Sequence, residues 1–363
     1  MRIGVSLLNF RPGCMGGIET YFRKLAEFLP ACAEEAGDRI VFFANREVFP
    51  LLPDGGAAEG ALLDRSRFGT SVLRLAEVFT PFRSRSCEAL VARAGVDVLF
   101  VPHQATFPKS PGVPVVITAH DVQHLRHPEY FSSFDRAFRK RAWDGRLAAV
   151  SGIVAISRFT AGCLREVCGV APERIRVVHH GFDPPKEEPL APLEGLDDPY
   201  LFYPAASYPH KGHVRLLESY AALRKAGRLD CRLVFCGMKT PHWKKAERAM
   251  RRLGIEEDVS HLGFVDRTTV RRLYAHCRAV VFPTEYEGFG LPVAEAAGFG
   301  KRIVCSKLEV FDELGVPKER QIDFSDPEAL FDALEKEGPE TPAPAYSWKD
   351  CARDTLRAVK SFS

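Results

Sequence analysis

Short apolar runs that alternate with helical stretches constrain the fold of this chain more than any other feature. Strand-like runs recur through the first half, and an amphipathic helical pattern covers residues 18–29 between the first two of them. Strands joined by helices run parallel, because each helix carries the chain back along the sheet before the next strand begins. The pattern therefore predicts an α/β fold with a mostly parallel, doubly wound sheet, its strands at residues 3–8, 39–44, 96–101, 113–118 and 152–156.

The same pattern starts again after residues 182–199, a stretch with five prolines among acidic residues. That composition is typical of an interdomain linker, and 363 residues are too many for one compact core. We therefore expect two domains, residues 1–181 and residues 182–345. The second is expected to have strands at 200–204, 231–236, 259–262 and 279–282, and helices at 214–225, 244–253, 270–276 and 292–297.

Composition excludes several classes of protein. Hydrophobic residues make up 46% of the chain and charged residues 27%, as in globular proteins, and no run approaches the ~20 apolar residues of a membrane span. The apolar run at the N-terminus is short and resembles a first strand, so we expect no signal peptide. The ten cysteines are scattered without a CxxC pair, which favours reduced thiols in a cytoplasm over a zinc ribbon or a disulfide framework.

Positive charge is concentrated in the first half, where residues 1–180 carry 23 Lys+Arg against 18 Asp+Glu. This excess is too small for a nucleic-acid binder and suits a surface that meets anionic lipid or a phosphorylated acceptor. Residues 65–85 also mix basic and apolar side chains, and they are a candidate lining for the binding site of such an acceptor molecule. Residues 131–143 form either an interfacial patch or a helix packed on its own domain, and they interleave Phe131, Phe134, Phe138 and Trp143 with Arg136, Arg139, Lys140 and Arg141.

The most informative stretch is Pro283-Thr-Glu-Tyr-Glu-Gly-Phe-Gly-Leu-Pro-Val-Ala-Glu-Ala-Ala-Gly298. A strand, a Gly-Phe-Gly turn and a helix N-terminus in succession present free backbone N–H groups suited to a diphosphate. Pro292 fits the first position of the helix, and Glu295 is expected in its first turn. Glu287 and Glu295 flank the turn, and carboxylates accept hydrogen bonds from sugar hydroxyls. The stretch therefore indicates a nucleotide-sugar site, with one carboxylate for the hexose and the other for the ribose.

This spacing resembles the E-x7-E signature of retaining glycosyltransferase family 4, whose GT-B fold sets two Rossmann-like doubly wound domains across a cleft. Other segments are similar to landmarks of that family over nearly the whole chain: residues 15–21, 118–121, 155–160, 177–183, 207–212, 262–265, 273–276 and 346–349. The last of these resembles the start of a C-terminal helix, about residues 346–363, that crosses back onto the N-terminal domain. The resemblance implies an acceptor-binding N-terminal domain and a donor-binding C-terminal domain.

The resemblance also implies roles for individual residues. His120, Lys211 and Glu287 are the expected catalytic residues: His120 contacts the transferred sugar or positions the acceptor, and Lys211 neutralises the leaving diphosphate. The expected donor-binding residues are Gly16, Gly17, Ser207, His210, Lys211, Gly237, Gly263, Phe264, Val265, Glu287, Gly288, Phe289, Gly290, Leu291 and Glu295. Retention could proceed through a covalent intermediate or, as the family suggests, through a same-face displacement; no carboxylate is clearly placed as a nucleophile.

The chain departs from the family pattern where an arginine often precedes the lysine by five or six residues, because here those positions are Ala206 and Ala205. Diphosphate binding must then depend more on Lys211, with Ser207 or His210 as helpers. The chain also lacks a D-x-D pair, the usual metal holder of the other major glycosyltransferase fold, which implies metal independence and no cofactor. His120, His124 and His127 are spaced for a metal only on a continuous helix, which Pro128 disfavours.

The resemblance implies transfer of a hexose to a saccharide or polyprenyl-linked saccharide in cell-surface polysaccharide assembly, including that of lipopolysaccharide. GDP-mannose is the expected donor, with UDP-linked glucose or N-acetylglucosamine as alternatives. The expected location is the cytoplasm, with the inner face of the plasma membrane as a peripheral site. A dinucleotide-binding oxidoreductase is disfavoured, because neither a G-x-G-x-x-G after the first strand nor an acidic residue after the second is present. A nucleotide-sugar epimerase and a non-catalytic nucleotide-sugar-binding protein remain as alternatives.

Overall fold

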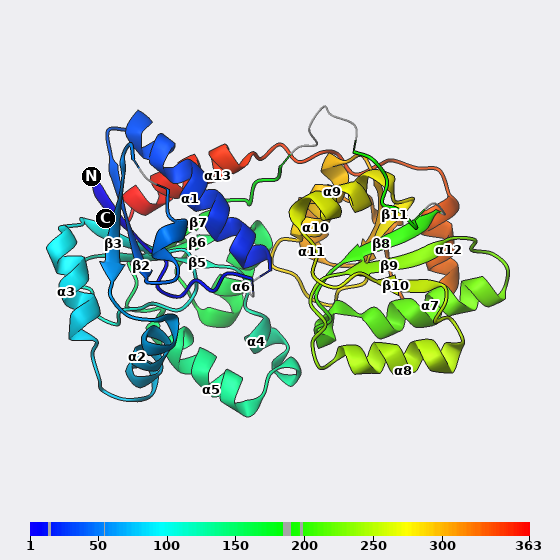
Figure 1. Ribbon diagram of the computed structural model, residues 1–363, viewed down its shortest axis with the longest axis horizontal. Coiled ribbons are helices and arrows are strands. Elements are labelled where there is room, and N and C mark those ends of the chain that lie inside the picture. The colour runs from blue at the N-terminus through cyan, green and yellow to red at the C-terminus, as the bar shows by residue number, and fades with distance from the viewer. Residues whose placement is uncertain (14–15, 54, 184–189, 197–198) are drawn as a thin grey trace. The chain divides into compact units, whose positions relative to one another are not determined.

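The computed structural model describes residues 1–13, 16–53, 55–183, 190–196 and 199–363 (Figure 1). Cys14, Met15 and most of the proline-rich linker lie outside these residues. The chain splits into two compact units: Met1–Gly181 with Tyr346–Ser363 form unit 1, and Phe182–Ala345 form unit 2. No helix in the described part of the chain is both long and apolar enough to cross a bilayer.

Unit 1 is built on a seven-stranded parallel sheet with the strand order β3-β2-β1-β4-β5-β6-β7. Its central strands are buried along their whole length, as expected where helices cover both faces of a parallel sheet. The strands are β1 Arg2–Ser6, β2 Arg39–Asn45, β3 Ala58–Leu63, β4 Val98–Val101, β5 Val115–Ala119, β6 Gly152–Ala155 and β7 Ile175–Val177. The helices are α1 Gly17–Glu35, α2 Arg67–Phe79, α3 Arg85–Ala94, α4 Gln123–Arg126, α5 Ser133–Ala142, α6 Arg158–Cys168 and α13 Trp348–Lys360.

Unit 2 repeats this architecture with a six-stranded parallel sheet in the order β10-β9-β8-β11-β12-β13. The strands are β8 Tyr200–Pro204, β9 Arg232–Cys236, β10 Val259–His261, β11 Ala279–Phe282, β12 Arg302–Ser306 and β13 Gln321–Ile322. The helices are α7 His213–Lys225, α8 Trp243–Leu253, α9 Arg267–His276, α10 Leu291–Gly298, α11 Glu309–Glu313 and α12 Pro327–Glu335. Two doubly wound parallel sheets confirm the expected fold class.

Each sheet reverses its strand order once, between β1 and β4 in unit 1 and between β8 and β11 in unit 2. The loops that leave two such strands at their carboxyl ends diverge to opposite faces and leave a crevice between them, which is where ligands of open α/β sheets bind. In unit 2 these loops are residues 205–212 and 283–290. The topology therefore brings together the two segments that contain Lys211 and Glu287.

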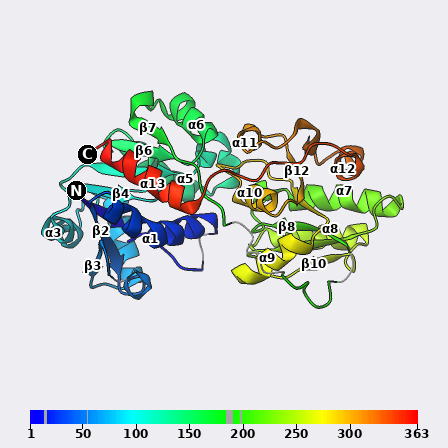
Figure 2. The same cartoon turned by 90° about the horizontal axis from the view of Figure 1, so that it is seen from above.

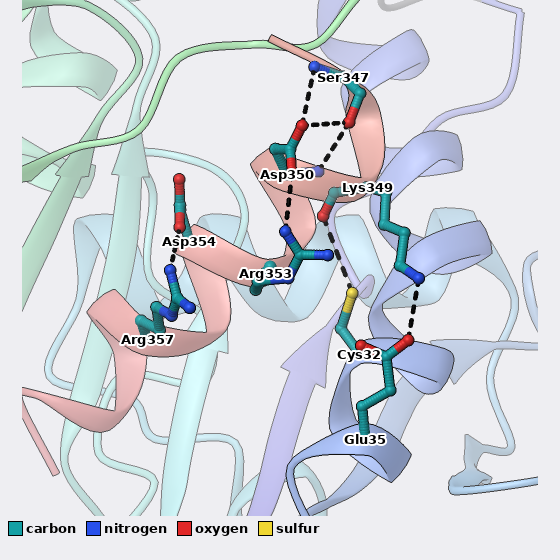
Figure 3. Close-up of polar contacts among 8 residues, drawn as sticks. All are labelled: Cys32, Glu35, Ser347, Lys349, Asp350, Arg353, Asp354 and Arg357. Carbon is teal, nitrogen blue, oxygen red and sulfur yellow. Dashed lines mark hydrogen bonds and ion pairs between the residues drawn. The ribbon is translucent and has the colours of Figure 1, made fainter.

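The C-terminal helix α13 belongs to unit 1 and packs along α1, as the view from above shows (Figure 2). Lys349 Nζ lies 2.9 Å from Glu35 Oε1, and the Cys32 thiol donates to the Lys349 carbonyl (Figure 3). The helix begins with a capping box in which Ser347 and Asp350 satisfy each other's backbone N–H groups. Gly181 packs directly on the Trp348 backbone, where a Cβ would come within 2.3 Å of the Trp348 nitrogen. These contacts hold the end of the chain on unit 1.

Candidate active site

The loops after β8 and β11 are joined to each other by backbone contacts. The Glu285 N–H donates to the His210 carbonyl at 2.7 Å, and the Thr284 hydroxyl donates to the same oxygen at 3.3 Å. Gly212 has a φ of 65°, and a Cβ there would lie 2.2 Å from the Pro283 carbonyl oxygen. Only glycine allows both this backbone conformation and this approach. The turn that carries Lys211 is therefore fixed against the segment that leads to Glu287.

Lys211 and Glu287 form an ion pair across these two loops. Both side chains are mostly buried, at 15% and 16% exposed. The ammonium also lies 5.4 Å from the centre of the Phe282 ring, and the Tyr203 hydroxyl donates to the Lys211 carbonyl at 2.7 Å. Glu287 therefore balances the Lys211 charge within the protein, and a donor diphosphate that bound Lys211 would compete with Glu287 for the same cation.

The N-terminus of α10 differs in two details from expectation. The helix begins at Leu291, so Pro292 is its second residue, and Glu295 lies in the second turn, where no dipole argument applies. The expectations of a first-position proline and a first-turn glutamate were wrong because Gly290, with a φ of 90°, serves as the N-cap and lets the helix begin one residue earlier. Gly288, Phe289 and Gly290 are buried, and Gly290 packs against Phe311.

Glu295 is itself 8% exposed, and its carboxylate is paired with Arg267 at 2.6 Å between Oε1 and Nη1. Arg267 is the first residue of α9, and its other terminal nitrogen lies 3.6 Å from Asp183. Sequence reasoning missed Arg267, because nothing near it in the chain distinguishes it from other surface arginines. The pairing joins α9 to α10, which are also connected by the Tyr274 hydroxyl donating to the Pro292 carbonyl at 3.2 Å.

The loops after β9 and β10 complete this edge of unit 2. Gly237 lies against the Ala205 and Ala206 backbone, where a Cβ would come within 2.7 Å, and its N–H donates to the Gly263 carbonyl at 2.7 Å. Phe264 follows Gly263 and is 74% exposed, and Val265 is half-buried. These loops therefore present backbone and an aromatic ring at the position where we expect the nucleotide base.

Ser207 and His210, which we expect to assist Lys211 in diphosphate binding, contact other groups of the protein. Ser207 is fully buried, and its hydroxyl accepts from the Thr240 N–H at 2.8 Å, so it connects the loops after β8 and β9. The His210 ring stacks on Tyr208 with the ring centres 6.0 Å apart. Direct donor contacts by these side chains remain predictions.

In unit 1, His120 follows β5 at the carboxyl edge of the sheet and is 4% exposed. Its Nε2 lies 3.1 Å from the Pro102 carbonyl oxygen, and burial lowers the pKa of the ring. Tyr21 packs edge-on to His120 and stacks on His180, and the His103 ring centre lies 6.2 Å from that of His120. Sequence reasoning missed this ring cluster, because its members come from four distant segments. Gly16 and Gly17 are exposed at the start of α1 in this unit.

The histidines that could suggest a metal site each contact a different partner. His124 Nε2 lies 3.0 Å from Asp144, and His127 Nδ1 lies 3.1 Å from Glu129, whereas His120 contacts a carbonyl. Among the residues that the structure describes, no group of three or more His, Cys, Asp or Glu side chains is arranged to hold a metal ion.

Buried histidines make the stability of the fold depend on pH. Burial lowers the pKa of His213 to about 3, and the ring is 3% exposed among Tyr203, Phe235 and Trp243. Below pH 6.5 His213 binds a proton in the unfolded chain but not in the native chain. The free energy of unfolding therefore decreases as the pH falls, and it stops decreasing near the folded-state pKa of His213. We expect unit 2 to lose about 1.4 kcal/mol per pH unit from His213 alone between pH 6 and pH 4. Urea unfolding of wild type and His213→Phe across this range measures the difference.

The His213→Phe variant keeps a ring of similar size but cannot titrate, so its stability should fall less steeply with decreasing pH. A His213→Phe slope equal to that of wild type would contradict the prediction.

Two family models together cover most of the chain. Residues 15–186 match Glycosyltransferase Family 4, and residues 186–337 match the glycosyl transferases group 1 model. The chain is a family 4-like glycosyltransferase of the GT-B fold. This confirms the expected family and enzyme class.

Relatives of this glycosyltransferase include several named mannosyltransferases. It is 25% identical to O-antigen chain mannosyltransferase B of Escherichia coli over 270 residues, which cover 68% of this chain and 70% of the relative. It is 22% identical to O-antigen chain mannosyltransferase RfbU of Salmonella typhimurium, covering 54% of this chain and 53% of the relative. It is 28% identical to the MMP alpha-(1->4)-mannosyltransferase of Mycolicibacterium hassiacum, covering 57% and 51%. The chain thus spans about half the length of the last two.

Solved structures share the fold over the whole length of the glycosyltransferase. Anabaena Alr3699/HepE in complex with UDP and glucose has a TM-score of 0.62 at 19% identity, with 100% of this chain and 96% of that chain covered. WaaG, a glycosyltransferase involved in lipopolysaccharide biosynthesis, has a TM-score of 0.63 at 15% identity, with 99% and 96% covered. At these identities the likeness concerns the fold alone.

Proposed function

We propose that this glycosyltransferase moves a hexose, with retention, from a nucleotide sugar bound by unit 2 to a saccharide acceptor bound by unit 1. The observation that carries the proposal is the cluster of Lys211, Glu287 and the α10 N-terminus at the switch point of the unit 2 sheet. Lys211 and the loop amides bind the diphosphate, Glu287 binds the hexose and Glu295 the ribose. As the sugar leaves, Lys211 stabilises the charge that grows on the diphosphate.

The acceptor belongs to cell-surface polysaccharide assembly in this proposal, as a saccharide or a lipid-linked saccharide. The names of the O-antigen mannosyltransferase relatives support this pathway. In unit 1, His120 contacts the transferred sugar or the acceptor hydroxyl. Its burial keeps the ring neutral near pH 7, so it acts through hydrogen bonding rather than as a fixed cation.

The donor in this proposal is GDP-mannose. Support comes from the mannosyltransferase names among the relatives. HepE was solved with UDP and glucose, but its similarity to this chain concerns the fold alone. We expect calorimetry to show GDP binding about tenfold tighter than UDP, a difference of about 1.4 kcal/mol. GDP-mannose should also be turned over in the presence of a saccharide acceptor. Tenfold tighter binding of UDP would exclude the guanine donor but not the glycosyltransferase.

We further propose that unit 1 associates with an anionic bilayer. The aromatic side chains of α5 partly pack against α2, with the Phe79 and Phe134 rings 5.8 Å apart and Arg74 over Phe138. The exposed apolar stripe therefore lies mainly on α2, at the helical spacing of Phe68, Val72, Leu75 and Phe79, which are 79%, 48%, 41% and 40% exposed. A stripe of this kind on a helix surface is a feature of interfacial binding.

Basic side chains also lie near α2, beside another of its faces. A surface hollow of about 820 Å³ between α2 and α3 is lined by Arg65, Arg83 and Arg85 together with Leu73 and Phe82. Arg83 is paired with Glu88, whereas no carboxylate in the described part of the chain lies within ion-pair distance of Arg65 or Arg85. An exposed apolar stripe and uncompensated positive charge on the same part of unit 1 fit an anionic headgroup layer.

We expect vesicles of phosphatidylglycerol to co-sediment the protein at low salt, and vesicles of phosphatidylcholine to leave it in solution. Each engaged basic residue contributes roughly 1 kcal/mol, and screening by salt reduces the binding. Val72→Ser/Leu75→Ser should weaken binding. Val167→Ser, at a similarly exposed valine on α6, should not. Equal binding of both variants, or no binding of wild type at low salt, would refute the membrane surface.

A further inference from the structure

The carboxylate of Glu295 is held from two directions within unit 2. Arg267 Nη1 contacts Glu295 Oε1 at 2.6 Å, and Arg267 Nη2 lies 3.6 Å from Asp183 Oδ2. The Glu295 side chain is 10% exposed, whereas the Arg267 side chain is 43% exposed, so the arginine covers the glutamate from the solvent side. A planar guanidinium placed between two carboxylates has a fixed orientation, which a lysine ammonium could not provide.

The Glu295 charge affects three neighbouring groups: Arg267, Tyr274 and Cys236. Burial opposes the charge of Arg267, but the neighbouring Glu295 charge and hydrogen bond raise the pKa of the guanidinium. Tyr274, about two turns further along α9, is buried. Burial, and after it the Glu295 charge, raises the pKa of its hydroxyl well above the ordinary value. Burial, and after it the nearby Glu295 charge, raises the pKa of the Cys236 thiol at the end of β9. Arg267 is therefore the cation that compensates a nearly buried carboxylate.

Arg267 also links segments that carry different parts of the expected donor. It begins α9, directly after the base loop 263–265 and the N-cap Asp266, whose carboxylate accepts from the Thr269 N–H at 2.9 Å. Its other partner, Asp183, follows Phe182, whose ring lies so close to Gly298 that a Cβ there would come within 2.3 Å. Gly298 is the last residue of α10, the helix that carries Glu295. One guanidinium thus connects the base loop, the ribose carboxylate and the start of the linker.

We infer that Arg267, supported by Asp183, is a positioning residue that holds the Glu295 carboxylate in a fixed orientation for the donor ribose. The inference rests on the proposed ribose role of Glu295. Arg267 is not expected to contact the donor phosphates, because its charge is already compensated by the carboxylates of Glu295 and Asp183. Removal of Arg267 would leave an uncompensated carboxylate that is nearly buried, which would reorient and accept ribose hydrogen bonds less well.

The test compares GDP with 2′,3′-dideoxy-GDP by calorimetry, and UDP with its dideoxy analogue if UDP binds more tightly. The ratio of the two dissociation constants reports on the ribose hydroxyls and cancels losses that affect the whole pocket. We expect wild type to prefer GDP by tenfold or more, and Glu295→Gln to lose most of this preference. Arg267→Gln should reduce the ratio at least fivefold, Asp183→Asn should reduce it less, and Arg267→Lys should restore part of it.

Arg252→Gln is the matched control, since Arg252 makes an ion pair of equal length, 2.6 Å, with Glu218 on the exposed surface of unit 2. It should keep the wild-type ratio. If Arg267→Gln weakens both nucleotides equally, its role is merely structural and the inference is wrong, although the ribose role of Glu295 stands. If wild type does not discriminate between the nucleotides, the ribose role fails and the inference fails with it. If Arg267→Gln does not fold, the ratio of dissociation constants is measured for Arg267→Lys and Asp183→Asn instead. Wild-type ratios in both of these variants would overturn the inference.

Discussion

We expect Lys211→Ala to lower kcat by about 10²–10³-fold while the protein remains folded. The ammonium is the cation that the loops after β8 and β11 place at the switch point, and the alanines at 205 and 206 leave no arginine before it in the chain. At ~4 Å and an effective dielectric of ~20, one positive charge stabilises a growing negative charge by about 4 kcal/mol. Initial rates with GDP-mannose and a saccharide acceptor, over a range of donor concentrations, measure the loss.

Lys225→Ala is the control for this experiment, because it removes the same charge from the exposed end of α7. Its kcat should stay within about twofold of wild type. EDTA should leave the wild-type rate unchanged, since the proposed phosphate ligands are Lys211 and backbone amides. Near-normal turnover by Lys211→Ala, or loss of activity with EDTA that magnesium or manganese restores, would contradict this account of leaving-group stabilisation.

We expect substitutions of Glu295 and Glu287 to affect different steps, nucleotide binding and turnover respectively. Glu295→Gln should weaken binding of the bare nucleoside diphosphate by about 10–100-fold, because a charge-assisted hydrogen bond to the ribose contributes roughly 1.5–3 kcal/mol. Glu287→Gln should lower kcat by about 10²-fold and leave binding of the bare nucleotide unchanged or tighter. The reason is the ion pair: without the Glu287 charge, Lys211 is no longer shared and can turn fully to the diphosphate.

Calorimetry with GDP and steady-state kinetics with the sugar donor measure the two halves of this prediction. Glu285→Gln is a useful control, because Glu285 lies in the same loop but pairs with Arg215 at 3.1 Å. It should change neither quantity strongly. Equal loss of affinity for bare GDP in the Glu287 and Glu295 variants would refute the division of roles.

Much of this site could be predicted from the sequence, because its main elements are local. The strand before Pro283, the Gly-Phe-Gly turn and the helix with Glu295 follow one another within a single stretch, and each is specified by nearby residues. The glycines at 212, 237 and 290 adopt positive φ values at turns that the sequence marks with glycine. Long apolar runs such as β4 and β5 are buried on both faces and were therefore recognisable as strands.

Other elements were not recognisable, because tertiary contacts decide them. β3 contains Ala58, Gly60 and Ala61 and has little strand propensity; it is a strand because it pairs with β2 along its length. β13 has only two residues and forms at the end of a sheet. The expected helix at 18–29 continues to Glu35 through Pro30, where packing against α13 supports the last turns.

The sequence alone determined which residues are available for chemistry: Lys211, His120 and two glutamates eight positions apart, on a doubly wound scaffold. Only the tertiary structure decided how they are paired. Lys211 contacts Glu287, 76 residues further along the chain, because β8 and β11 are neighbours in the sheet although β9 and β10 separate them in sequence. Arg267 contacts Glu295 because the fold brings the first residue of α9 to the middle of α10. Ion pairs of this kind depend on distances between segments that local propensity does not encode, so no pattern of spacing could reveal them.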